Sequence, residues 1–307
     1  MATTEPGARS RPLGGPLAEA KSLAAGLPDL LVEARRVASV VVAGWHGRRT
    51  SGRGETFWQY RHFMPDDTTA GIDWRRSARD HNLYVRETEW EAAHTIWLWV
   101  DLSASMETRS KLAPVSKRDR AIVILLALAE LLSKAGERVG LLGVGNPILS
   151  RNAPERLAEY LSHTGDSGLA PDARNLRRLS DLVMIGDFFD PLDEIEKVLE
   201  PITRSGTRAH LLQVVDPIEE TFPFAGRVEF RDPETGATHV LDRTEMHRGE
   251  YERLLAAHRD RLMRICRGLD WTFLVHHTDK PATDPLLALD ARLSERGLGV
   301  AAGALAA

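Results

Sequence analysis

The chain has a single cysteine, Cys266, in 307 residues. No intrachain disulfide can form, which excludes the disulfide-stapled class of secreted domains. Cys266 falls in a helical pattern, and we expect it to be a buried thiol rather than a reactive one. We also expect no secretory signal, because Gly, Pro and Arg rather than an apolar block follow the first residues.

Long apolar runs and a strong net charge are lacking as well. The most apolar run, residues 121–132, is shorter than the roughly 20 residues that span a bilayer, so we expect no membrane span and a cytoplasmic protein. The net charge is −4, and the eight Arg of residues 44–91 are matched by eight acidic residues. This balance argues against a nucleic-acid partner. No G-x-x-x-x-G-K-[ST] motif occurs, so we expect no nucleotide hydrolysis.

What is present is an alternation of strand and helix patterns. The strands are predicted over 95–100, 139–144, 182–185, 209–215 and 271–275, and the helices over 118–135, 154–163, 192–204, 251–269 and 285–296. Such alternation predicts an α/β fold with a mostly parallel sheet and helices on both faces. A β-hairpin with a Pro/Gly turn is predicted over 228–241, as an insertion into this pattern.

Composition divides the chain into five segments. We expect a disordered N-terminus over 1–16, a helical segment over 17–43 that is broken at Pro28, and a small Arg/Trp-rich β subdomain over 44–93. The α/β domain then occupies 94–296, and an Ala/Gly-rich stretch over 297–307 is predicted to be a flexible tail. Three tryptophans near the subdomain, Trp45, Trp58 and Trp74, are expected in its core.

Oxygen-bearing side chains follow two of the predicted strands. Asp101, Ser103 and Ser105 come directly after strand 95–100, and Asp187 follows strand 182–185. Because ligands of open parallel sheets bind beyond the carboxyl ends of the strands, we expect these groups to converge there. An all-oxygen set suits a hard cation, so the sequence predicts a Mg²⁺ site, or a site for another divalent cation. Helix capping is the alternative role for the same residues, and a Lys or Arg head group between them would contradict the metal site.

The D-x-S-x-S pattern of residues 101–105 resembles the metal-ion-dependent adhesion site of von Willebrand factor A domains. The resemblance implies a von Willebrand factor A-like, Rossmann-type fold and a further hydroxyl ligand from a later loop. Either Thr164 or Ser167 fits that position, and the sequence leaves the choice open. Asp187 matches the Asp that the family takes from a later strand.

A wider resemblance covers roughly residues 44–296. The segments that carry it are Gly52-Arg53-Gly54-Glu55, Ile72-Asp73-Trp74-Arg75, Ser77-Ala78-Arg79, Val85-Arg86-Glu87, Val215-Asp216-Pro217 and Phe230-Arg231-Asp232-Pro233-Glu234-Thr235-Gly236. They are similar to bacterial proteins of the domain of unknown function 58 (DUF58) family. That resemblance implies a von Willebrand factor A-like domain that serves as the adaptor of a MoxR-type AAA+ ATPase.

Together these features predict a non-enzymatic, metal-ion-dependent protein-interaction module. Its partner-binding residues are predicted to be Asp73, Trp74, Arg75, Arg79 and Asp216. Ion pairing within the small subdomain is the alternative role for its Asp and Arg residues. The alternative function is a metal-dependent, phosphatase-like hydrolase that uses Asp101, although Ser103 stands where such enzymes need a second Asp as the general acid.

Overall fold

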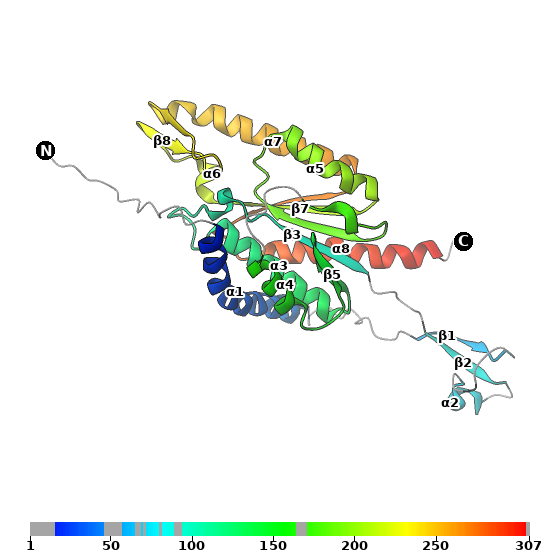
Figure 1. Cartoon of the computed structure of the whole chain (residues 1–307). Helices are drawn as coiled ribbons and strands as arrows, with labels where there is room; N and C mark the ends of the chain where they lie inside the picture. The colour runs from blue at the N-terminus through cyan, green and yellow to red at the C-terminus, as the bar shows by residue number, and fades with distance from the viewer. Residues whose placement is uncertain are drawn as a thin grey trace.

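A computed structural model describes residues 16–45, 57–64, 69, 72–79, 82–88, 94–163 and 171–304 (Figure 1). The predicted disordered N-terminus lies outside the described residues except for Pro16, which begins the first helix. The two candidate hydroxyl ligands, Thr164 and Ser167, also lie outside them.

A six-stranded sheet forms the centre of the molecule. Its strands are β3 (Thr95–Val100), β4 (Arg138–Leu141), β5 (Val144–Ile148), β6 (Asp181–Gly186), β7 (Arg208–Val215) and β10 (Thr272–His277). They lie in the order β10-β7-β6-β3-β4-β5, and every neighbouring pair is parallel except β4–β5. The prediction of an α/β fold with a mostly parallel sheet is therefore confirmed.

The predicted strand over 139–144 is wrong in one respect, because the chain reverses within it. Gly143 has φ +84°, a conformation that favours glycine, and the turn there joins β4 to the antiparallel β5. Gly140 has a different role within β4. A Cβ atom at that position would lie 2.7 Å from the ring of Trp97, so glycine allows the neighbouring strand β3 to pack closely.

Helices cover both faces of the sheet (Figure 1). The helices α1 (Pro16–Trp45), α3 (Lys117–Lys134), α4 (Ala153–His163) and α8 (Thr283–Ala304) contribute to one hydrophobic cluster, and α5 (Leu192–Ser205) and α7 (Arg248–Gly268) contribute to the other. Alternate residues of β3 serve the two clusters. Leu98 and Val100 belong to the first, whereas Trp97 and Trp99 belong to the second, as expected for a strand that is buried on both faces.

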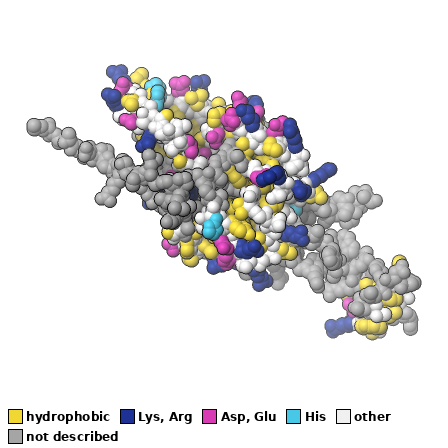
Figure 2. Space-filling model, in the orientation of Figure 1, with side chains coloured by type: hydrophobic (Ala, Val, Ile, Leu, Met, Phe, Trp, Pro, Cys, Tyr) yellow, Lys and Arg dark blue, Asp and Glu magenta, His cyan; other side chains and the backbone are white. Residues whose placement is uncertain are grey.

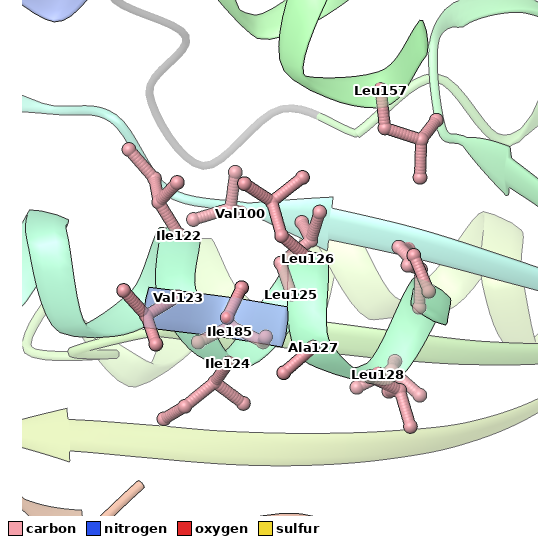
Figure 3. Packing of buried hydrophobic residues seen from close by; sticks show 14 of the residues in the cluster. Val100, Ile122, Val123, Ile124, Leu125, Leu126, Ala127, Leu128, Leu157 and Ile185 are labelled. Carbon is pink, nitrogen blue, oxygen red and sulfur yellow. The ribbon is translucent and has the colours of Figure 1, made fainter. Parts of the chain in front are cut away.

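Helix α3 is the central helix of the first cluster. Its residues from Ala121 to Ala129 are all buried, and they pack against Val100 of β3 and Ile185 of β6 (Figure 3). A helix that is apolar around its whole circumference belongs inside a protein. Ser116 caps the start of the helix, because its side chain accepts a hydrogen bond from the backbone N–H of Asp119.

Smaller elements complete the described residues. They are β1 (Phe57–His62), α2 (Trp74–Ser77) and β2 (Tyr84–Thr88); the 3₁₀ turns Ala104–Glu107, Ala173–Asn175 and Thr244–His247; α6 (Pro217–Thr221); and the hairpin of β8 (Val228–Arg231) and β9 (Thr238–Leu241). The β1–β2 pair is antiparallel and lies apart from the central sheet (Figure 1). The predicted hairpin is present, with Val228 opposite Leu241.

Three local predictions are corrected. Helix α1 runs through Pro28 without a break, because buried residues beyond the proline (Ala34, Val37, Ala38 and Val41) hold it in the core cluster with α3 and α4. Trp74 is 64% exposed instead of lying in a core. Helix α8 reaches Ala304, within the segment predicted as a flexible tail.

No helix in the described parts of the chain combines the length and apolar character needed to cross a bilayer. Buried Cys266 matches its predicted place in the interior, where burial raises the pKa of the thiol to about 12.

Candidate functional site

The candidate site lies where the strand order of the sheet reverses. After β3 the chain crosses to β4 on one side, and after β6 it crosses to β7 on the other side. Because β3 and β6 are neighbours, their carboxyl ends form a switch point, the usual ligand position in such sheets. Asp101 and Asp187 are the residues that follow these two strands.

The end of β6 permits a close approach of the two strand ends. The backbone N–H of Asp101 donates to the carbonyl oxygen of Ile185 at 2.8 Å. A Cβ atom on Gly186 would lie 3.1 Å from Cβ of Asp101, so the absence of a side chain at 186 leaves room for the Asp101 carboxylate.

One chain of hydrogen bonds joins the four predicted ligands. Asp101 Oδ1 accepts from the backbone N–H of Ser103 at 2.9 Å, and the hydroxyls of Ser103 and Ser105 are 3.1 Å apart. Ser105 Oγ then donates to Asp187 Oδ2 at 2.8 Å. Oxygen atoms from two strand ends therefore meet at one edge of the sheet.

A lysine that the sequence analysis did not select is part of this site. The side chain of Lys117, the first residue of α3, is fully buried, and its Nζ lies 2.8 Å from Asp187 Oδ2 and 2.6 Å from Glu219 Oε1. The ammonium also faces the ring of Phe189, 5.2 Å from its centroid. The carboxylate oxygen that Lys117 binds is the same one that accepts from Ser105, so an ammonium already holds part of the predicted metal site.

The environment of Lys117 keeps it protonated. Burial lowers its pKa, but the negative charges and hydrogen bonds of Asp187 and Glu219 outweigh burial, and the pKa is raised overall. Burial raises the pKa of Glu219 despite its contact with Lys117. A sequence signal for this cluster exists, because cations in the first turn of a helix oppose the helix dipole. Lys117, Arg118 and Arg120 all lie there and are all buried.

Asp216, a predicted partner-binding residue, is instead a structural cap. It is fully buried; Oδ1 accepts from the backbone N–H of Ile218 and Oδ2 from that of Ser110, both at 2.8–2.9 Å. Together with Glu219 it forms a capping box at the start of α6. Asp216 thereby fixes the helix that presents Glu219 to Lys117.

Asp101 differs from Asp187 in having no ion-pair partner among the described residues. Its side chain is nearly inaccessible, with 2% of the residue exposed. Burial raises its pKa to about 6; the negative charges of Asp187 and Asp190 add to the rise, and the hydrogen bonds from Ser103 oppose it. The pKa of Asp190 is raised too, by desolvation and by the charge of Asp187. The Asp101 side of the site is therefore short of positive charge.

A second residue that the sequence analysis did not select reaches the site from the β8–β9 hairpin. Glu234 Oε1 accepts from the backbone N–H of Ser105 at 2.8 Å, across a separation of 129 residues. Glu234 lies in the predicted hairpin segment that resembles the DUF58 family, but no local pattern in the sequence connects that hairpin to residues 101–105.

The other predicted partner-binding residues lie on and beside α2. Asp73 caps this helix by accepting from the backbone N–H of Arg76 at 2.9 Å, and it also accepts from the hydroxyl of Tyr60 at 3.2 Å. Trp74, Arg75 and Arg79 are exposed. These residues belong to the small subdomain and not to the switch-point site.

The metal-ligand chemistry of the switch point rests on hydroxyls as much as on carboxylates. No group of three or more His, Cys, Asp or Glu side chains with a metal-binding arrangement occurs among the described residues. Any ion at this site would have to use Ser103 and Ser105 together with the carboxylate of Asp101.

Proteins with similar sequences are known. An uncharacterized protein of Mycobacterium bovis is 29% identical over 278 residues, which are 84% of this chain and 86% of that protein. An uncharacterized protein of Mycobacterium tuberculosis matches with the same values.

Two crystal structures are similar to about two thirds of the chain. An aerotolerance-related membrane protein of Bacteroides fragilis has a TM-score of 0.40 and 14% identity, and covers 66% of this chain and 100% of its own. The conserved hypothetical protein BatB of Bacteroides thetaiotaomicron has a TM-score of 0.37 and 11% identity, over 66% of this chain and 98% of its own.

The family model described as "Protein of unknown function DUF58" matches residues 59–261, which are more than half of the chain and include both strand ends of the site. The chain belongs to the DUF58 family.

Proposed function

We propose that this chain is a non-enzymatic protein-interaction module with a von Willebrand factor A-like fold, whose switch-point site binds a partner in a metal-ion-dependent manner. The observation that carries the proposal is the buried Asp101 carboxylate, which lies beside two hydroxyls and has no ion-pair partner among the described residues. A buried carboxylate in such a place is costly unless a cation or a proton joins it.

The donor set of this edge fits a hard divalent cation on the Asp101 side. Asp101, Ser103 and Ser105 offer oxygen atoms, which Mg²⁺ prefers. On the Asp187 side Lys117 competes with an ion, so Asp187 would act through its hydrogen bond to Ser105. A bound Mg²⁺ would supply the positive charge that attracts a carboxylate of the partner.

Resemblance to the DUF58 family supplies the identity of the proposed partner. Members of that family are thought to serve as adaptors of MoxR-type AAA+ ATPases, and we propose such an ATPase as the partner of this chain. The exposed residues Trp74, Arg75 and Arg79 would form a second contact surface, since Trp and Arg are enriched in interface hot spots.

The proposal is tested by titrating the purified chain with Mg²⁺ in a calorimeter and by capturing the ATPase in Mg²⁺ and in chelator. Asp101→Ala should abolish both Mg²⁺ binding and Mg²⁺-dependent capture while the chain stays folded. Capture that persists in this variant and in chelator would refute the metal-dependent mechanism. Mg²⁺ binding by Lys117→Met but not by the wild type would show that the lysine replaces the metal.

The hydrolase alternative makes a separate prediction. Ser103 stands two residues after Asp101, and its backbone N–H already holds Asp101 Oδ1. A leaving group at this edge would have no carboxylic acid at that position to protonate it. Turnover of para-nitrophenyl phosphate that is lost in Asp101→Asn would favour the hydrolase and contradict the non-enzymatic proposal.

A further inference from the structure

The β8–β9 hairpin contributes a carboxylate to the switch-point site from a remote part of the chain. Glu234 Oε1 accepts from the backbone N–H of Ser105 at 2.8 Å. The hydroxyl of the same serine is bound to Asp187 at 2.8 Å. Glu234 therefore contacts the residue that links the D-x-S-x-S segment to the end of β6.

The tip of the hairpin is built to hold Glu234 in one orientation. Asp232 Oδ1 accepts from the backbone N–H of Glu234 at 2.9 Å, and Asp232 Oδ2 accepts from the hydroxyl of Thr235 at 2.5 Å. Gly236, with φ +71°, donates its N–H to the carbonyl of Asp232 at 2.9 Å and closes the turn. The backbone of the turn is thereby ordered in advance, so only the side chain of Glu234 has to be ordered when it binds.

The hairpin is anchored beside the same site by an aromatic side chain near the tip end of β8, where Phe230 pairs with His239. Phe230 of β8 stacks on Phe222 with a centroid distance of 5.8 Å and meets Phe224 edge-on at 5.0 Å. Phe222 also stacks on Tyr251 at 4.5 Å, and the hydroxyl of Tyr251 donates to the backbone carbonyl of Glu219. The anchor thus adjoins the residue that holds Lys117, whereas most other residues of the two strands are exposed.

The residues around Glu234 add little stability to its hydrogen bond with Ser105. Glu234 is exposed, and its negative charge lies close enough to Asp190 to help raise the pKa of that carboxyl group. One hydrogen bond therefore works against repulsion between like charges. An isolated two-stranded ribbon is only marginally stable, so the turn beyond Phe230 can leave this contact at small cost.

We propose that the hairpin is an intramolecular acidic ligand of the switch-point site, and that a carboxylate side chain of the partner protein binds by displacing Glu234 from Ser105. This inference rests on the interaction role proposed above and adds to it a built-in competitor for the carboxylate of the partner. The site then discriminates against weak acidic partners, because each must replace a tethered carboxylate whose effective concentration is on the order of millimolar or more.

The contact itself is tested by hydrogen exchange of the backbone amides of residues 103–109 in the whole chain. Glu234→Ala removes the acceptor and should speed the exchange at Ser105 about tenfold or more, whereas Glu229→Ala, an exposed acid on the same hairpin, should leave it unchanged. The result is expected in chelator as well as in Mg²⁺, since the hydrogen bond involves protein atoms only. Unchanged exchange in Glu234→Ala, or equal acceleration by both variants, would overturn the proposal.

Competition is tested with a fluorescein-labelled synthetic peptide of residues 228–241. The peptide should bind the Glu234→Ala protein at least about tenfold more tightly than it binds the wild type, because the tethered competitor is gone. The same peptide with Ala at 234 should bind neither protein. The proposed displacement of Glu234 would be overturned if the peptide bound wild type and variant equally well, or if it did not bind the variant. It would also be overturned if the peptide with Ala at position 234 bound as well as the unchanged peptide. Loss of Mg²⁺ binding alone would refute the metal part of the proposed function and leave these results unaffected.

Discussion

Replacement of Asp101 by Asn should stabilise the metal-free protein at neutral pH. The carboxylate is nearly inaccessible and has no ion-pair partner among the described residues, so its ionised form is poorly solvated. Asn retains an Oδ1 atom that can accept the 2.9 Å hydrogen bond from the backbone N–H of Ser103. The substitution therefore removes the charge and keeps the local geometry.

The magnitude follows from the pKa of Asp101, which is raised from 3.8 to about 6. Each pKa unit corresponds to about 1.4 kcal/mol, so ionisation of Asp101 costs the folded state roughly 3 kcal/mol relative to the unfolded state. Between these two pKa values the folded state holds a proton that the unfolded state has released. The free energy of unfolding of the wild type therefore falls as pH rises through this window.

The assay is urea denaturation of wild type and Asp101→Asn in chelator over about pH 4 to 8. We expect the two proteins to be equally stable near pH 4 and the variant to be more stable by up to about 3 kcal/mol above pH 7. Asp260→Asn, an exposed site on α7, is the control and should change nothing. A variant less stable than the wild type at neutral pH, or a difference independent of pH, would refute the reasoning. Mg²⁺ that binds Asp101 would stabilise only the wild type, so it would narrow or reverse the difference.

Lys117→Met should destabilise the protein by about 3–5 kcal/mol in urea denaturation, because the buried Asp187 and the partly buried Glu219 lose their shared ammonium. The exposed Lys197→Met should leave the stability nearly unchanged, and a similar loss in both variants would contradict a special role of Lys117. Gly140→Ala should lower the free energy of unfolding by about 1–3 kcal/mol, because the new Cβ atom clashes with the indole ring of Trp97 in β3. The control is Gly249→Ala, whose Cβ atom would meet nothing within 4 Å and which should be neutral or stabilising in thermal unfolding. Burial lowers the pKa of His276 from 6.5 to about 4. The unfolded state therefore binds the extra proton, and stability should fall as pH drops from 6.5 towards 4; a His276→Asn variant with the same slope would exclude this histidine as the cause.

The sequence was sufficient to predict the central sheet and the meeting of two strand ends. Strand β3 is recognisable because six apolar residues run directly into Asp101, and the order of strands and helices indicates a parallel sheet. The β4–β5 turn was missed because its strands form one apolar run, and only the left-handed backbone of Gly143 separates them.

Mixed charges over α5 and α7 (Figure 2) match the small net charge of the sequence.

The contacts of Lys117 and Glu234 could not be predicted in the same way. Each joins residues that are far apart in the sequence: 70 between Lys117 and Asp187, and 129 between Ser105 and Glu234. Hydrophobic periodicity predicts local secondary structure, and the order of the strands indicates which strand ends are near one another. Neither predicts which distant residue a side chain at a helix start or a hairpin tip will contact. The basic first turn of α3 is the one local feature that, through its conflict with the helix dipole, marks Lys117 for attention.

The position of Lys117 divides the acidic edge into two halves with different chemistry. On the Asp187 side the ammonium satisfies both Asp187 and Glu219, and removal of the lysine leaves two uncompensated charges. On the Asp101 side no cation is provided by the described residues, and the carboxylate is destabilised by burial and by its acidic neighbours. An incoming cation therefore gains most beside Asp101, next to the serine whose backbone N–H holds Glu234. A cation there would also weaken the repulsion that opposes Glu234. We therefore expect a metal ion to strengthen both the contact of Glu234 with Ser105 and the binding of the partner. The balance between these two effects would decide which carboxylate accepts the hydrogen bond from the backbone N–H of Ser105.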